Sequence, residues 1–182
     1  IAALRGLSSP ESSRRGNIFG IIGMIIAVIA TLVAVDFINS DRTTIGLVIL
    51  ALIIGAVIGS TIARKIAMTA MPQLIAAFHS LVGLAAVFVA VAAFYAPEAY
   101  NIGTVGHIHT LSIVEMSLGA IIGAITFSGS VIAFGKLQGI ISGSPITFKG
   151  QHLLNLLIGN IIILGVIYFS LNQEANIFWG II

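Results

Sequence analysis

The sequence contains no cysteine and little charge, and both absences narrow what the protein can be. Only 8% of its 182 residues are Asp, Glu, Lys or Arg, whereas about 25% is usual in soluble domains. The absence of cysteine excludes disulfides, thiolate metal sites and thiol redox chemistry. The net charge of +2 is small, and the basic residues fall in short loops instead of one patch. We therefore expect neither a soluble domain nor a nucleic-acid partner.

Motifs for phosphate binding and for enzymatic catalysis are also missing. No Gly-rich phosphate loop follows a strand, and there is no nucleophile elbow, kinase motif or hydrolase motif. No signal peptide is recognisable near the first residues. Movement of a proton or an ion is the chemistry that remains.

Long apolar runs dominate what is present, since 58% of the residues are hydrophobic. Runs of this length predict membrane-spanning helices and exclude an outer-membrane barrel of short alternating segments. We expect an all-α, polytopic transmembrane helix bundle that forms one domain over residues 1–182. Five complete spans are predicted at about 18–35, 45–63, 72–95, 111–134 and 153–171, with partial helices at 1–4 and 176–182. Because the sequence starts with Ile1 and stops within an apolar run, we also expect a segment of a longer polypeptide.

The distribution of Lys and Arg predicts the orientation of these spans. Seven of the eight basic residues fall on one side, in the connections 5–17, 64–71 and 135–150, and only Arg42 falls on the other. Basic residues are enriched on the inner side of membranes. The three connections should therefore face the cytoplasm or the mitochondrial matrix.

The third span, from Met71 to Tyr95, is the stretch around which we expect the rest to be arranged. Pro72 stands where a helix tolerates proline, and the 23 residues after it carry no full charge. His79 lies within this span, on the order of 10 Å into the membrane. An ionisable group at that depth is a functional candidate, and a histidine can load and release a proton. The alternative is a neutral histidine that bonds a neighbouring helix for packing.

The fourth span carries a carboxylate and several hydroxyls. Glu115 is either the outer mouth of a proton path or a carboxylate near the headgroups with access to water. Thr126, Ser128 and Ser130 lie toward the inner half, with Gly129 between the two serines. Their hydroxyls either carry a water wire or bond to carbonyls of their own helix. The residues alone leave both alternatives open.

Other polar and small residues favour structural roles. His107 and His109 alternate in a short connection and could hold a metal as a pair. No further ligand has a matching spacing, so we expect a solvated loop and no metal site. Gly119 and Gly123, four residues apart, let two helices approach closely.

Four stretches are specific enough to point to a known family. Residues 71–87 read Met-Pro-Gln-Leu-Ile-Ala-Ala-Phe-His-Ser-Leu-Val-Gly-Leu-Ala-Ala-Val, and residues 123–139 read Gly-Ala-Ile-Thr-Phe-Ser-Gly-Ser-Val-Ile-Ala-Phe-Gly-Lys-Leu-Gln-Gly. Both closely resemble the membrane domain of proton-translocating nicotinamide nucleotide transhydrogenase, and residues 13–20 and 150–155 fit the same family. The chain looks like the N-terminal part of the beta subunit, or the matching stretch of the single-chain mitochondrial enzyme.

The resemblance implies an activity for the complete enzyme. The family couples hydride transfer from NADH to NADP+ with inward proton movement across the bacterial plasma membrane or the mitochondrial inner membrane. His79 matches the membrane histidine implicated in proton translocation. By the same resemblance, Glu115, Gly129 and Ser130 match polar or small positions of the neighbouring channel helix, with Glu115 at the outer mouth. We also expect Ser80, Thr126 and Ser128 to line the channel.

Cofactors and partners follow from the same resemblance. NADP(H) and NAD(H) are expected to bind elsewhere in the complete enzyme and not to this chain. The expected partners are the alpha subunit or NAD-binding domain, the NADP-binding domain, the remaining membrane helices and the lipid bilayer. The complete enzyme is expected to be a dimer.

We expect a proton to enter past Glu115, reach His79 along hydroxyls and water, and leave inward when the NADP-binding domain changes state. Connections 64–71 and 135–150 are the natural contacts for that domain. Two other classes compete with this interpretation. A secondary transporter or ion channel would need a helix break near the midplane, and the spans show none. A structural scaffold would leave His79 without a role.

Overall fold

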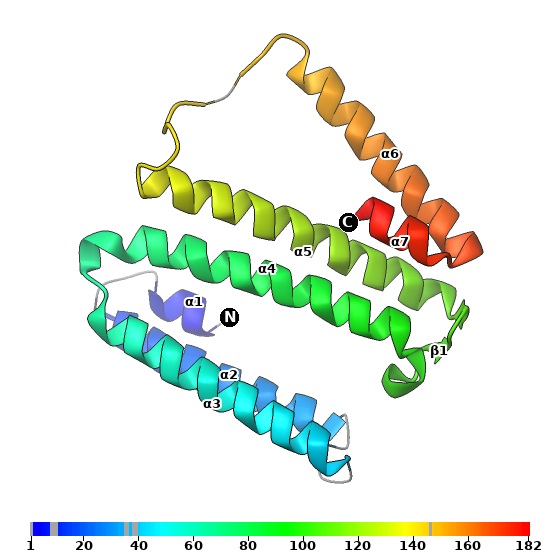
Figure 1. Ribbon diagram of the computed structural model, residues 1–182. Helices are drawn as coiled ribbons and strands as arrows, with labels where there is room; N and C mark the ends of the chain where they lie inside the picture. Colours follow the sequence, from blue (N-terminus) through cyan, green and yellow to red (C-terminus); the bar gives the residue numbers. More distant parts are fainter. Residues whose placement is uncertain (1, 8–10, 35–36, 38–39, 146) are drawn as a thin grey trace. The chain divides into compact units, whose positions relative to one another are not determined.

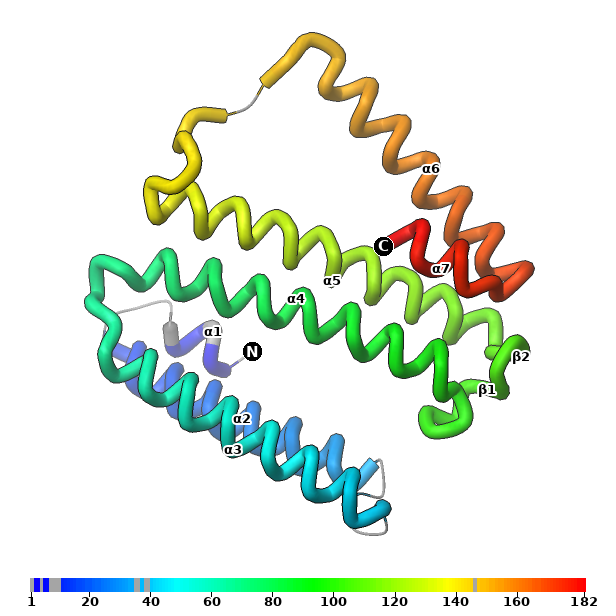
Figure 2. Tube along the Cα trace, in the orientation of Figure 1, coloured from blue at the N-terminus to red at the C-terminus, as the bar shows by residue number. Residues whose placement is uncertain are grey.

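The computed structural model describes residues 2–7, 11–34, 37, 40–145 and 147–182, and most of them are helical (Figures 1 and 2). The elements in chain order are α1 (Ala2–Leu7), α2 (Ser13–Ala34), α3 (Arg42–Lys65), η2 (Met68–Ala70), α4 (Met71–Tyr95), η3 (Pro97–Tyr100), β1 (Gly103–Thr104), β2 (His107–Ile108), α5 (Thr110–Leu137), α6 (Gln151–Asn172) and α7 (Ala175–Ile181).

Five helices in the described part of the chain are long and apolar enough to cross a membrane. They are α2, α3, α4 together with η2, α5 and α6. At about 1.5 Å per residue, the 22 residues of α2 already exceed the ~30 Å hydrocarbon core of a bilayer. The prediction of an all-α, polytopic membrane bundle is confirmed.

The helices extend beyond several of the expected spans. α2 begins at Ser13, five residues before the expected start, and the Gly16 amide donates to the Ser12 carbonyl at 2.9 Å. Arg14 and Arg15 are exposed on this first turn, so the helix can include them without burying a charge. The end of this span expected at residue 35 lies outside the described residues.

The chain divides into two compact units, residues 1–62 and 63–182. In the first unit, α1 packs on the start of α2, where a methyl group on Gly6 would lie 2.5 Å from the Gly16 Cα. At the start of α3, the Thr43 amide donates to the Asp41 carboxylate at 3.0 Å. Hydrogen bonds from the Thr43 side chain and then its backbone lower the pKa of Asp41 below its ordinary value.

The second unit is built on the antiparallel pair of α4 and α5 (Figure 1). Pro72 stands in the first turn of α4, as expected. The two helices touch at Gly83, where a methyl group would lie 2.6 Å from the Phe127 amide nitrogen and 2.7 Å from the Gly123 carbonyl oxygen. Only glycine permits this backbone contact.

A small hairpin that the sequence did not predict joins the two helices. β1 and β2 are antiparallel, with Gly103 opposite Ile108. The Gln173 side chain, in the turn between α6 and α7, accepts from the Ile108 amide at 2.8 Å and donates to the Ile108 carbonyl at 3.1 Å. One amide side chain thus continues the hairpin's hydrogen bonding and ties it to the α6–α7 turn.

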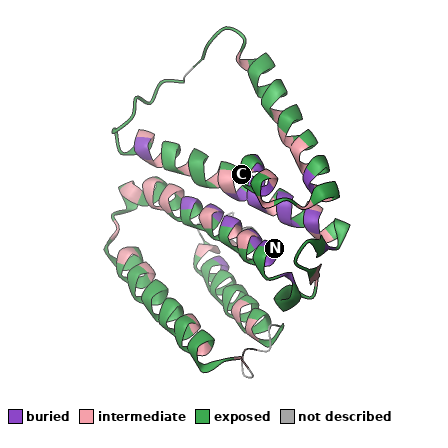
Figure 3. Cartoon of the chain, turned by 45° about the vertical axis from the view of Figure 1, so that its right-hand side comes forward, coloured by how far each residue is buried: buried purple, intermediate pink, exposed green. Residues whose placement is uncertain are grey.

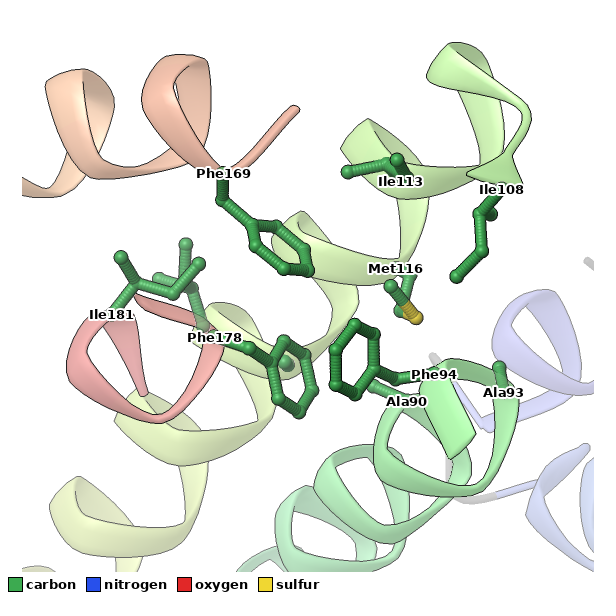
Figure 4. Close-up of a cluster of buried hydrophobic side chains, with 11 residues drawn as sticks. Ala90, Ala93, Phe94, Ile108, Ile113, Met116, Phe169, Phe178 and Ile181 are labelled. Carbon is green, nitrogen blue, oxygen red and sulfur yellow. The ribbon is translucent and has the colours of Figure 1, made fainter. Parts of the chain in front are cut away.

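The core of this unit lies at the same end, where α4, α5, α6 and α7 meet (Figure 3). Three aromatic rings fill it, and the Phe94 and Phe178 rings stack at 4.7 Å while Phe169 lies 5.5 Å from each (Figure 4). Ile113 and Ala120 of α5 are fully buried against them. The hairpin end of α4 and α5 is therefore held by four helices.

Candidate functional site

His79 lies in the first third of α4 with an exposed ring. Its Nδ1 is 3.2 Å from the carbonyl oxygen of Ile75, one turn earlier in the same helix. Within the described residues, no other group hydrogen-bonds to the ring. The imidazole is therefore neither sealed among aliphatic side chains nor paired with a neighbouring helix.

Glu115 lies in a shallow groove of about 320 Å³ between α4 and α5. The lining is mostly small and apolar, and Tyr100 and Glu115 are the two residues in it that carry a polar side-chain group. Its lining residues are Ala86, Val89, Ala90, Ala93, Tyr100, Glu115, Met116 and Gly119.

Helical spacing extends the face of this groove along both helices. His79 lies seven residues before Ala86 and fourteen before Ala93, close to two and four turns. On α5, Thr126 lies seven residues after Gly119, and Ser130 lies eleven after it, close to three turns. We call this side of the α4–α5 pair, defined by His79, Glu115, Gly119, Thr126 and Ser130, the polar face.

Gly83 brings the two halves of the polar face together. It lies one turn after His79 on α4, and a methyl group added to it would be 3.0 Å from the Thr126 Cβ. His79 and Thr126 therefore lie within about one helical turn of the same crossing point.

The serine and threonine hydroxyls of the long helices fall into two groups. Beyond the first turns of α2–α6, seven of them donate to a carbonyl three or four residues earlier in their own helix: Thr31, Ser60, Thr61, Ser80, Ser117, Ser128 and Ser170. The remaining two are Thr126 and Ser130, which hydrogen-bond to nothing in the described part of the chain. Both belong to the polar face.

Ser80 and Ser128 do not share this arrangement, although the sequence groups them with the channel residues. Ser80 is buried and donates to the Ala77 carbonyl at 2.7 Å. Ser128 is two residues from both Thr126 and Ser130, and two residues on a helix are about 200° apart. It lines a different cavity of about 380 Å³, with Leu84 of α4 and Ile181 near the end of α7. Gly129 carries no side chain, and a methyl group there would meet nothing within 4 Å.

Gln73 is a polar residue of α4 that the sequence did not single out. Its Nε2 donates to the Leu137 carbonyl at 3.3 Å, which ties the first turn of α4 to the last residue of α5. Its Oε1 is buried and has no partner among the described residues. A lone amide near the start of an apolar run was the available signal.

His107 and His109 lie at the opposite end of α5, on β2 and just before the helix. Both side chains are exposed. In the ranges that the structure covers, no group of three His, Asp or Glu side chains could hold a metal ion.

Comparison with known proteins gives one consistent result. The family model of the NAD(P) transhydrogenase beta subunit matches residues 1–182. The NAD(P) transhydrogenase subunit beta of Rhodospirillum rubrum is 59% identical over 152 residues, which is 84% of this chain and 32% of the relative. The protein of the same name from a strain of that species matches to the same extent. The chain thus spans about a third of the length of the curated relatives it matches.

Proposed function

Because this chain belongs to the NAD(P) transhydrogenase beta subunit family, we propose that it is the proton-conducting part of that subunit's membrane domain. In the complete enzyme, it couples hydride transfer from NADH to NADP+ with inward proton translocation. The hydride-transfer sites of this Re/Si-specific reaction belong to other parts of the enzyme.

The observation that carries the proposal is the pair of unbonded hydroxyls on the polar face. Lipid supplies no hydrogen-bond partner, so an intramembrane polar group needs protein or water beside it. Seven other hydroxyls use their own helix carbonyls, whereas Thr126 and Ser130 do not. Together with the exposed ring of His79, they favour a polar face that borders water or another helix instead of acyl chains.

The path then runs along the α4–α5 pair. A proton is received near the Glu115 carboxylate at the hairpin end and passes along water held by the Thr126 and Ser130 hydroxyls. His79 stores it as an imidazolium ion. Its release toward connections 64–71 and 135–150 follows a change in the domain that contacts them, so the charge on His79 biases a two-state element.

The described residues do not fit a dinucleotide. β1 and β2 have two residues each, and no strand leads through a Gly-rich turn into a helix within them. The two grooves of about 380 and 400 Å³ are lined mainly by aliphatic side chains. We therefore assign NAD(H) and NADP(H) to the alpha subunit or NAD-binding domain and to the NADP-binding domain, and the path involves neither cofactor.

The same proposal covers assembly and location. The partners are those two domains and the remaining membrane helices, in a dimer of the complete enzyme. The membrane is the bacterial plasma membrane or the mitochondrial inner membrane. Connections 5–17, 64–71 and 135–150 lie on the cytoplasmic or matrix side, as their basic residues indicate.

The decisive experiment replaces His79 with Ala in the complete enzyme. In inside-out vesicles, the reverse reaction from NADPH to NAD+ draws protons into the lumen, and this uptake should fall by at least about a hundredfold, since general acid–base groups contribute roughly 10²–10⁴ in rate. His107→Ala is the matched control, because its ring is exposed on the hairpin and lies away from the polar face. Normal proton uptake by an assembled His79→Ala enzyme would refute the proposal.

A further inference from the structure

We infer that His79 loads and releases its proton through Nε2 alone, while the Ile75 carbonyl holds Nδ1 permanently as an N–H donor. The inference rests on the proposed function, because it specifies how the proposed relay works. It names the atom that exchanges the proton and a backbone group that positions the ring.

The contact with the Ile75 carbonyl determines the tautomer of the neutral His79 ring. A backbone carbonyl can only accept a hydrogen bond, so an Nδ1 atom 3.2 Å from the Ile75 oxygen must carry the hydrogen. That oxygen has two lone pairs and can also accept the helical bond from the His79 amide. A neutral imidazole carries one N–H only, so its free lone pair is on Nε2.

The other ring nitrogen, Nε2, is accessible from outside the helix. Nε2 has no partner within the described residues, and the ring is exposed. The side of α4 that carries it also carries the groove of Glu115, and the unbonded Thr126 and Ser130 hydroxyls lie on the same polar face. Nε2 is thus the ring nitrogen available to a water on this face.

The chemistry balances at this one atom. The Nε2 lone pair takes a proton from a hydronium ion or a donor water, which forms the imidazolium ion. Release breaks the same Nε2–H bond and returns the lone pair, while the Nδ1–H bond to Ile75 persists throughout. No oxidant, leaving group or second proton is required.

A single exchanging nitrogen also bears on the direction in which His79 passes its proton. A relay that takes a proton at one ring nitrogen and releases it at the other would need tautomerisation or a ring flip that breaks the Ile75 bond. With a single exchanging nitrogen, direction depends on what Nε2 faces before and after the conformational change. The switch must therefore alter the surroundings of the polar face and not the ring itself.

The test places two methylated histidines at position 79 of the complete enzyme and measures proton uptake by vesicles. Methylation of Nε2 should reduce uptake to the level of His79→Ala. Methylation of Nδ1 removes the Ile75 bond but leaves the exchanging nitrogen, so uptake should stay within about tenfold of wild type. The inference is overturned if the Nε2-methyl enzyme pumps, or if both methylated enzymes fail to pump.

Nitrogen-15 NMR of labelled His79 in the unmodified enzyme provides a measurement that needs no variant. The neutral ring should show a protonated Nδ1 and an unprotonated Nε2, and the reverse would contradict the inference. The proposed function fails separately, if His79→Ala itself pumps normally. Loss of pumping in His79→Ala with full pumping in the Nε2-methyl enzyme would refute only the assignment of the nitrogen.

Discussion

Individual polar residues in the long helices differ in whether their own helix satisfies them. Ser117 is fully buried and donates to the Ile113 carbonyl at 2.7 Å, so it needs no other partner. Thr126 and Ser130, four positions apart on the same helix, also carry hydroxyl groups, but neither hydroxyl makes such a bond. The side chain's orientation, and not its chemical type, separates a packing hydroxyl from one that can hold water.

The first residue-scale prediction concerns these two hydroxyls. Thr126→Val and Ser130→Ala should each lower proton uptake by roughly tenfold, since losing a hydrogen-bonding group in the path is worth about 1–2 kcal/mol. Ser128→Ala should have a smaller effect than Ser130→Ala, because Ser128 lies on the far side of α5. The measurement is proton uptake by inside-out vesicles per NADPH oxidised in the reverse reaction.

Ser170→Ala is the control for these variants. Its hydroxyl donates to the Val166 carbonyl at 2.8 Å in α6, away from the polar face, so uptake should not change. Equal losses in Ser128→Ala and Ser130→Ala would contradict the assignment of the path to one face.

At the scale of elements, the crossing of α4 and α5 fixes the relation between His79 and the fourth span. The backbones meet at Gly83 and Gly123, and the Gly123 position is as tight as its partner, with a methyl group 2.7 Å from the Gly83 carbonyl oxygen. Such contacts stabilise helix pairs in lipid, where packing replaces the hydrophobic effect.

Gly83→Ala should therefore destabilise the protein by about 1–3 kcal/mol, the usual effect of adding a methyl group to a close-packed contact. Thermal unfolding of the detergent-solubilised enzyme measures it. Gly159→Ala is the matched control, because a methyl group there meets nothing within 4 Å in the described residues. Equal stability of the two variants would show that the helices can separate at no energetic cost.

The hairpin and the α6–α7 turn form a second coupled element. Gln173 adopts the left-handed conformation, with φ of 54°, and its amide bonds both backbone groups of Ile108. Each bond is worth about 0.5–1.5 kcal/mol. The connection between the third and fourth spans is therefore ordered by a residue 65 positions away.

Gln173→Ala should open the hairpin locally, and hydrogen exchange at the Ile108 amide should accelerate by roughly tenfold or more, as loss of about 1–3 kcal/mol implies. Gln138→Ala serves as the control, since that exposed side chain hydrogen-bonds to nothing in the described ranges. Unchanged hydrogen exchange at the Ile108 amide would mean that the hairpin is stable without the two hydrogen bonds from Gln173.

At the scale of the whole molecule, the absence of cysteine makes the orientation directly testable. Met68 and Ile140 are highly exposed in the connections predicted to face inward, and Val105 is exposed on the hairpin. Single cysteines at these positions have no competing thiol in this chain.

Met68→Cys and Ile140→Cys should react with a membrane-impermeant thiol reagent from the inner side, and Val105→Cys from the outer side. The physical reason is the excess of Lys and Arg in the inner connections. Labelling of inside-out and right-side-out vesicles compares the two sides. Reaction of all three cysteines from one side would overturn the predicted orientation.

The sequence by itself determined the class and the approximate helices, and it put forward His79 as the candidate proton relay. The apolar runs are long enough to span a bilayer, and the eight basic residues lie near their ends. These two features indicate membrane-spanning helices because the bilayer sets both the length of a span and the placement of its charges. α2 begins at Ser13, earlier than expected, because Arg14 and Arg15 are exposed and a helix end can include them without burying a charge.

Only the tertiary structure showed which hydroxyls bond to their own helix and which, like Thr126 and Ser130, do not, because that depends on how each side chain is rotated. The predicted channel included Ser128 together with Thr126 and Ser130, whereas packing places Ser128 in another cavity. The hydrogen bonds from Gln173 to Ile108 and from Gln73 to Leu137 were likewise not predicted from the sequence. Each joins residues more than sixty positions apart, and local patterns carry no information about such pairs.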